Sequence, residues 1–214
     1  MKFNTQLTLP TLLLGLLAVA IPFTANWHLP LLDGLVVRCI ENGQALWLLF
    51  GAVFTFCYIR PLSCSEGKKQ FWLWAVVWWL VLLGRSTSWG RDYFPEHPKL
   101  VFRAISVVLI AMIILPVLIS KPLRREMVRR FREEPLPLWL LVITVCTFLI
   151  SDTVEHHRLL GPLFLHNTRY GDLIEELYEV PFMVGLFLIN FGIMRRDKHE
   201  AYSSVHVGKP QLVD

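Results

Sequence analysis

The stretch "FWLWAVVWWLVLLGRSTSWGRDYF", residues 71–94, decides how the chain folds. It opens with an uncharged apolar run that follows Lys69 and ends at Arg85. A helix that crosses a bilayer needs about 20 mainly apolar residues, and this run is several residues too short. Counted from Lys69, such a helix ends near residue 90, so Arg85 falls within the outer leaflet and Arg91 falls beyond it. The stretch therefore predicts a membrane helix with a charged residue inside its outer end.

The rest of the chain has the same apolar character. Of its 214 residues, 54% are hydrophobic and eight are Trp, which is too apolar for an ordinary soluble domain. We predict an all-α, polytopic transmembrane bundle that forms a single domain over residues 1–214 and ends in a cytoplasmic tail at 199–214. Its six helices are expected at about 6–25, 36–59, 70–90, 100–120, 136–156 and 174–194. In an alternative interpretation the first segment is a cleaved signal peptide, because Lys2 precedes it and Ala18-Val19-Ala20 resembles a cleavage site.

The basic residues indicate the orientation of the bundle. Lys and Arg gather between the second and third helices, between the fourth and fifth, and after the sixth. Because cytoplasmic loops carry the excess of Lys and Arg, these segments and both termini are predicted to lie in the cytoplasm. The net charge of +4 then reflects topology, and we expect no nucleic-acid partner. The mixed Arg and Glu residues of 121–135 predict a short helix on the inner leaflet.

In four of the predicted helices the apolar run stops short of the outer end of the span. Measured from the cytoplasmic side, the second, third, fifth and sixth run for about 15 uncharged residues, or about 22 Å of a hydrocarbon core about 30 Å thick. The residues that follow are ionisable or strongly polar, and the fourth helix begins in the same way. Ionisable groups at membrane depth usually face the bundle interior and pair with one another. We therefore predict one polar cavity that opens to the outer side above an apolar floor.

This polar layer contains candidates for a metal site and for proton transfer. Asp152 and His156 lie one helical turn apart, and Glu179 is predicted to complete a divalent-metal site with them. Glu155 and Glu175 are the candidates for proton transfer. Other candidate ligands are Glu175, Glu176 and His166, and only one of the tandem pair His156 and His157 can face inward.

The same layer contains candidates for substrate binding. Arg85 and Arg103 are predicted to bind an anionic head group, because guanidinium groups bind phosphate or carboxylate through two hydrogen bonds. Glu41 and Trp89 complete this predicted site. A purely structural interpretation stays open, in which the charges snorkel to the head groups or form buried ion pairs that hold the helices in register.

Two runs resemble known membrane proteins. Ser88-Trp89-Gly90-Arg91 and the later run Glu175-Glu176-Leu177-Tyr178-Glu179 resemble uncharacterised bacterial multi-pass inner-membrane proteins with an SWG(Q/R) motif and a later EExxE cluster. This resemblance implies a location in the cell inner membrane and no particular activity. The site chemistry is also similar to that of the alkaline-ceramidase-like membrane hydrolases, which gather His, Asp, Ser and Glu around zinc. Those proteins have a seventh helix and an HxxxH pair, which this sequence lacks, so the similarity concerns chemistry alone.

Two functions fit these observations. The first is a hydrolase or transferase, metal-dependent if a divalent metal is bound, that acts on a lipid or lipid-linked substrate from the outer face. The alternative is a non-catalytic lipid-binding or accessory membrane subunit, or a component of small-solute transport. The expected partners are membrane lipid and either another membrane protein or a second copy of the chain.

Overall fold

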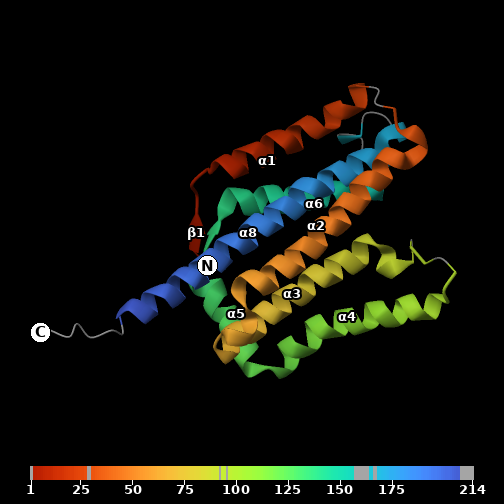
Figure 1. The fold of residues 1–214 in the computed structure, drawn as a ribbon. Coiled ribbons are helices and arrows are strands. Elements are labelled where there is room, and N and C mark those ends of the chain that lie inside the picture. The colour runs from red at the N-terminus through yellow and green to blue at the C-terminus, as the bar shows by residue number, and fades with distance from the viewer. Residues whose placement is uncertain are drawn as a thin grey trace, which may run out of the picture.

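The computed structural model is mostly helical, so the all-α prediction is confirmed (Figure 1). It describes residues 2–27, 30–91, 93–94, 96–156, 164–165 and 168–207. The described helices are α1 (Leu9–Ala20), α2 (Leu35–Ile59), α3 (Glu66–Ser86), α4 (Lys99–Ile119), α5 (Lys121–Glu133), α6 (Leu138–Glu155) and α8 (Gly171–Val207). Short 3₁₀ segments are η1 (Ile21–Trp27), η2 (Leu32–Gly34), η3 (Pro61–Ser63), η4 (Ser88–Gly90) and η5 (Thr168–Tyr170), and the strands are β1 (Lys2–Asn4) and β2 (Pro135–Pro137).

Five helical segments in the described part of the chain are long and apolar enough to cross a bilayer. This supports the prediction of a membrane protein. The segment missing from this group is α3, whose first turn is charged and whose four Trp residues lower its mean hydropathy. A sixth span at α3 therefore stays a prediction. The five segments are Leu9–Trp27, Leu35–Ser63, Lys99–Ile119, Leu138–Glu155 and Gly171–Glu200.

The long helices lie side by side with similar axes (Figure 1). α6 packs on α8, α2 packs on both α8 and α3, and α4 packs on the far side of α3. α1 lies against α6 and α8 at the other flank. α2 is therefore the central element, and its buried Leu48 and Ala52 form a core cluster with Trp79 of α3 and Met183 of α8. α4 is the least buried of the five candidate spans, as expected of a helix that faces lipid.

Two glycines allow close helix packing. A Cβ at Gly51 of α2 would lie 2.8 and 2.9 Å from ring carbons of Trp79, so the indole packs directly against the α2 backbone. A Cβ at Gly185 of α8 would lie 3.2 Å from the Cβ of Thr144 on α6. Small residues at helix contacts let backbones approach closely in membrane proteins.

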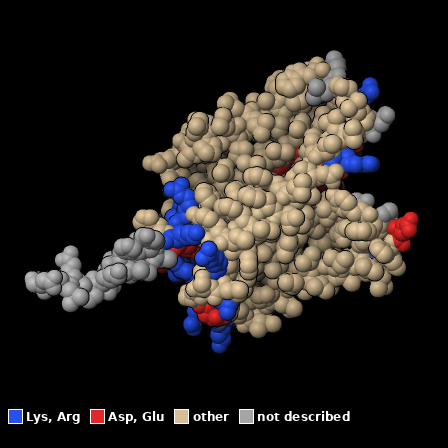
Figure 2. All heavy atoms as spheres, viewed as in Figure 1, with Lys and Arg blue, Asp and Glu red and all other residues tan. Residues whose placement is uncertain are grey.

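The basic segments predicted to be cytoplasmic meet at one end of the molecule. Figure 2 shows Lys and Arg gathered at the end where α5 and the last turns of α8 lie, beside a broad surface without charge. β1 pairs in parallel with β2 at this end, so the residues before α1 lie beside those that follow α5. The structure thus places these segments on one side, as the charge pattern requires, while the identity of that side as cytoplasmic stays a prediction.

A buried charged network attaches α5 to α3 and α8. Arg130 of α5 forms ion pairs with Glu126 of its own helix and with Asp197 of α8. Asp197 also accepts a hydrogen bond from the indole Nε1 of Trp72 on α3 (2.6 Å), and the Arg130 guanidinium lies 4.1 Å from the ring centroid of Phe71. Arg130, Glu126 and Asp197 are all buried. The predicted short helix therefore exists. Some of its charged residues are buried against α3 and α8, and others are exposed.

The ends of three helices differ by several residues from the predicted ends. α3 spans Glu66–Ser86 instead of 70–90, and the turn at Ser88–Gly90 follows it. α1 gives way at Ile21 to the 3₁₀ segment η1 instead of running to residue 25. α8 continues to Val207, well past the predicted end at 194. Asp197 lies on this extension, between the predicted helix end at 194 and the predicted tail at 199–214, and its ion pair with Arg130 attaches the extension to α5.

Candidate functional site

Polar side chains from four helices line one pocket toward the end of the bundle opposite α5. Its volume is about 250 Å³. Its floor is apolar and includes Leu48, Leu82 and Met183. We call it the acidic pocket, and its polar lining is Glu41 and Gln44 of α2, Arg85 and Ser86 of α3, Ser88 of η4, Glu155 of α6, and Glu175, Glu176 and Glu179 of α8.

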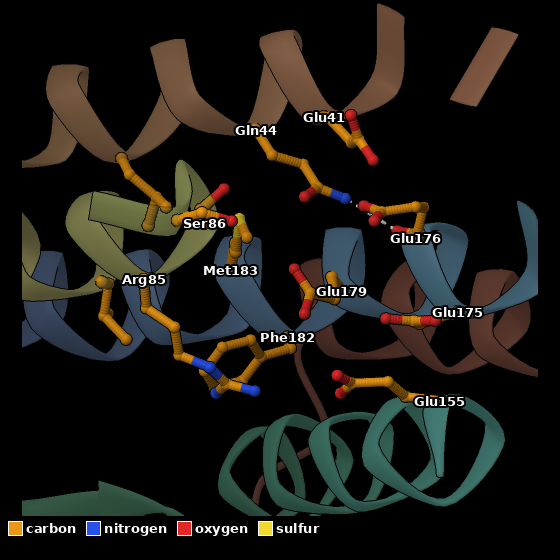
Figure 3. Close-up of a pocket in the computed structure, with 13 residues that line it drawn as sticks. Glu41, Gln44, Arg85, Ser86, Glu155, Glu175, Glu176, Glu179, Phe182 and Met183 are labelled. Carbon is orange, nitrogen blue, oxygen red and sulfur yellow. Dashed lines mark hydrogen bonds between the residues drawn. The ribbon is translucent and has the colours of Figure 1, made fainter. Parts of the chain in front are cut away.

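Helical spacing brings these carboxylates together. Glu175 and Glu179 lie four residues apart on α8 and so share a face. Figure 3 shows their carboxylates and that of Glu155 directed into a common space. Gln44 links α2 to α8, because its Nε2 donates a hydrogen bond to the backbone carbonyl oxygen of Glu176 (2.9 Å). Oε2 of Glu176 is buried and has no hydrogen-bond partner among the described residues.

Arg85 reaches into this pocket from the end of α3 (Figure 3). Its guanidinium lies 5.7 Å from the ring centroid of Phe148 on α6. The sequence predicted that Arg85 faces acidic partners on three other helices, and Glu41, Glu155 and Glu179 do line the same pocket. Within the described part of the chain, however, no ion pair joins Arg85 to a carboxylate, so the charges face one another across a cavity. That arrangement leaves room for a ligand between them.

A second pocket adjoins the first and is rich in cations. Its volume is about 660 Å³. Arg85, Ser88 and Glu155 line both pockets, so the two meet at these residues. We call it the basic pocket, and its remaining lining is Trp89, Arg91, Lys99, Phe102, Arg103 and Ser106. The predicted anion-binding residues Arg85 and Arg103 are therefore brought together.

The SWG run shapes the basic pocket through an unusual turn. Ser88, Trp89 and Gly90 all have positive φ, at 48°, 62° and 96°. Non-glycine residues rarely adopt this conformation, because Cβ approaches the following carbonyl oxygen. The turn folds the Trp89 ring back over α3, where a Cβ at Gly84 would lie 2.6 Å from it. The motif thus ends α3 and leads the chain toward α4, whose first turns supply Lys99 and Arg103 to the pocket.

The structure groups the predicted metal ligands differently from the sequence. Ligand atoms of Asp152, Glu155 and His156 lie within 4.8 Å of one another, and the His156 Nδ1 is 3.6 Å from both an Asp152 and a Glu155 carboxylate oxygen. Glu179 lines the acidic pocket and is not part of this group. Glu155 takes its place because it follows Asp152 on the same helix face. The group lies beside the junction of the pockets, where Glu155 is shared.

Some residues of these pockets were not singled out from the sequence. Gln44 was not proposed as a site residue, although its place three residues after Glu41 indicates a shared helix face. Lys99 was not proposed for a site, and Arg91 was placed beyond the end of the third helix. Their common pocket depends on the turn at Ser88, which no periodicity reveals. The alternative ligands His157 and His166 lie outside the described residues.

Comparison with known proteins adds no family to this description. No protein-family model, no curated protein and no solved structure matches the chain. The resemblance to bacterial proteins with an SWG motif therefore stays a prediction.

Proposed function

We propose that the chain is a six-helix protein of the cell inner membrane, with both termini in the cytoplasm, that acts on a lipid or lipid-linked substrate from the outer face as a hydrolase or transferase. The observation that carries the proposal is the junction of the two pockets at Arg85, Ser88 and Glu155. A head group at this junction meets cations on one side and carboxylates on the other.

The basic pocket suits the anionic part of such a substrate. Arg85 and Arg103 approach it from α3 and α4, and Arg91 and Lys99 add two further cations. Guanidinium groups bind phosphate through paired, charge-assisted hydrogen bonds, and Lys binds it as a point charge. Trp89 gives this pocket an aromatic wall of the kind found at membrane interfaces. A phosphate-bearing lipid head group fits this combination of charge and location.

The acidic pocket suits proton transfer at the reacting bond. Glu155 lies at the junction, so it can contact a substrate group held by Arg85. Glu175 and Glu179 of α8 line the same space. In hydrolysis, one carboxylate takes a proton from the attacking water and another group returns a proton to the leaving oxygen. We assign the first role to Glu155 and the second to Glu175.

A divalent metal fits beside this junction. Carboxylate oxygens of Asp152 and Glu155 with an imidazole nitrogen of His156 form a ligand set that zinc, manganese and iron accept. Such an ion supplies Lewis-acid activation of a substrate oxygen or of a water molecule. With a metal bound, Glu155 would be one of its ligands, and Glu175 would both take the proton from the attacking water and return it to the leaving oxygen.

Turnover of lipid in reconstituted vesicles tests the proposal. Purified protein in vesicles of mixed phospholipids should release a water-soluble head group or transfer it to another lipid, detected by mass spectrometry. Glu155→Gln and Glu175→Gln should abolish this reaction, and the exposed Glu96→Gln should serve as the matched control. Asp152→Asn and His156→Gln should also remove bound metal measured by elemental analysis. If the lipids stay unchanged with wild-type protein in the presence of zinc, manganese or iron, the non-catalytic alternative replaces this proposal.

A further inference from the structure

An apolar groove runs between α3 and α8, directly below the acidic pocket. We call it the α3–α8 groove, and its volume is about 210 Å³. Its walls include Trp74, Trp78 and Leu82 of α3, and Leu186, Ile189 and Ile193 of α8. Each set recurs at intervals of three or four residues and so forms one face of its helix. Two helices thus direct apolar faces into the same groove.

The groove and the acidic pocket are continuous. Leu82 lines both of them. On α8, Glu179 and Phe182 of the pocket precede Leu186 of the groove by two turns and one turn, respectively, along the same stripe. A molecule that occupies both spaces therefore has a polar end near Glu179 and an apolar end that extends toward Ile193.

Two polar side chains at the groove wall form hydrogen bonds within the protein. Trp74 Nε1 donates a hydrogen bond to the carbonyl oxygen of Ile113 on α4 (3.0 Å). The amide of Asn190 is 3.3 Å from Thr55 Oγ1 on α2. The groove wall is otherwise formed mainly by hydrocarbon and aromatic rings, which suits an acyl chain and disfavours a polar solute.

The groove is also open to the side. α3 packs mainly on α2 and α4, and α8 packs mainly on α6 and α2. The backbones of α3 and α8 do not approach closely through their described residues, so these helices meet through long side chains such as Trp79 and Met183. α4 and α6 likewise make no close backbone approach through their described residues. Trp78 in the groove wall remains 41% exposed. From Phe71 to Leu82 the wall of α3 rises about 16 Å, close to the roughly 15 Å of one leaflet of the hydrocarbon core.

We propose that the α3–α8 groove holds an acyl chain of the phosphate-bearing lipid whose head group lies at the junction of the two pockets. The lipid enters sideways from the bilayer, between α4 and α6, and its head group is drawn below the membrane surface to reach Arg85 and Glu155. This inference rests on the proposed function for the chemistry of the head group. It adds the substrate class, a membrane-resident phospholipid, and the route by which it arrives.

Photo-labelling of the full chain in vesicles tests the groove. Phosphatidylcholine vesicles carry a phosphatidylglycerol with a diazirine at the end of one acyl chain, and labelled peptides are identified by mass spectrometry. We expect label on residues 71–82 of α3 and 186–193 of α8. Ala75→Trp and Ile189→Trp, which fill the groove from opposite walls, should each lower this labelling about tenfold, equivalent to about 1.4 kcal/mol of binding. Ala104→Trp on the exposed surface of α4 is the matched control and should leave it unchanged.

The positions of the label show whether a lipid chain occupies the α3–α8 groove. Label confined to exposed lipid-facing residues such as those of α4, or groove labelling that survives both filling variants, overturns the proposal. Loss of labelling on formation of a cross-linked dimer through α3 or α8 would instead show that a second copy occupies the groove. If lipid turnover persists in both variants, the proposed function stands and the groove is not needed for it. If the groove is labelled but no lipid is turned over, the groove proposal stands and the proposed function fails.

Discussion

Gly51 provides a sharp test of how α2 packs on α3. An alanine Cβ at this position would lie 2.8, 2.9 and 3.1 Å from three ring carbons of Trp79, all inside the 3.4 Å at which ordinary van der Waals contact begins. Trp79 is only 3% exposed and packs between α2 and α8, so the ring has little room to withdraw. Overpacking of this kind typically costs about 1–3 kcal/mol. We expect Gly51→Ala to lower the free energy of unfolding by that amount.

Gly43, two turns earlier on α2, supplies the matched control. A Cβ there would meet no atom within 4 Å, so Gly43→Ala should gain about 0.5–1 kcal/mol through its higher helix propensity. Unfolding of both variants in mixed detergent micelles, followed by circular dichroism against denaturing detergent, measures the difference. We also expect Gly51→Ala combined with Trp79→Leu to lose less stability than the sum of the single changes, because the smaller side chain relieves the overlap. Equal stability of the two glycine variants would refute the α2–α3 packing described above.

Three further predictions concern the charged end of the molecule and the topology. Asp197→Ala should destabilise the fold by about 3–5 kcal/mol, because it removes one ion-pair partner of the buried Arg130. Glu200→Gln, which removes the exposed ion pair with Lys68, should cost at most about 1 kcal/mol. Thermal unfolding measures both changes. Burial raises the pKa of Glu126, but hydrogen bonds and charges from two arginines outweigh burial and hold the pKa below its usual value, so this group stabilises the fold above the pKa of the unfolded chain and loses that contribution as pH falls through the folded pKa. Glu126→Gln should therefore flatten the acid side of the stability profile, and an unchanged slope would contradict this. In a chain whose four native cysteines are replaced by serine, an impermeant maleimide added outside spheroplasts should label Glu96→Cys and leave Arg125→Cys unlabelled, with the reverse pattern showing an inverted topology.

The helical architecture follows from features that are visible in the sequence. Apolar runs of about 20 residues predicted where the helices lie, and the shortfall after Lys69 correctly indicated that Arg85 belongs to the polar layer. Glu41, Glu155 and Glu179 were expected in that layer for the same reason, and they line the acidic pocket. Length and charge thus indicated which residues gather in one polar pocket, because hydrocarbon of nearly fixed thickness limits where charged groups can lie along a span.

Other features depend on geometry that local patterns do not encode. Asp152, Glu155 and His156 occupy neighbouring positions on one turn, so helical spacing alone cannot select which of them faces the pocket. The basic pocket depends on three successive positive φ values beginning at Ser88, which redirect the chain toward Arg103. Sequence periodicity carries no information about such a turn, because two of its three residues are not glycine.

The network at the opposite end was missed for a related reason. Asp197 lies beyond the apolar part of α8, where a charged residue normally signals solvent. Its burial depends on α5 folding back against α3 and α8, which brings Arg130 and Trp72 to the same carboxylate. Long-range packing of this kind has no periodic signature along the chain.

Native mass spectrometry of the purified protein tests the central claim most directly, namely that the paired pockets hold a phospholipid head group. Wild-type protein released from detergent should retain a single phospholipid, and Arg85→Gln should lose it because the junction of the pockets loses its shared cation. Arg125→Gln, which changes an exposed residue on α5, should retain the lipid as wild type does. Wild-type protein without bound lipid, or equal retention by the Arg85 and Arg125 variants, would contradict the account.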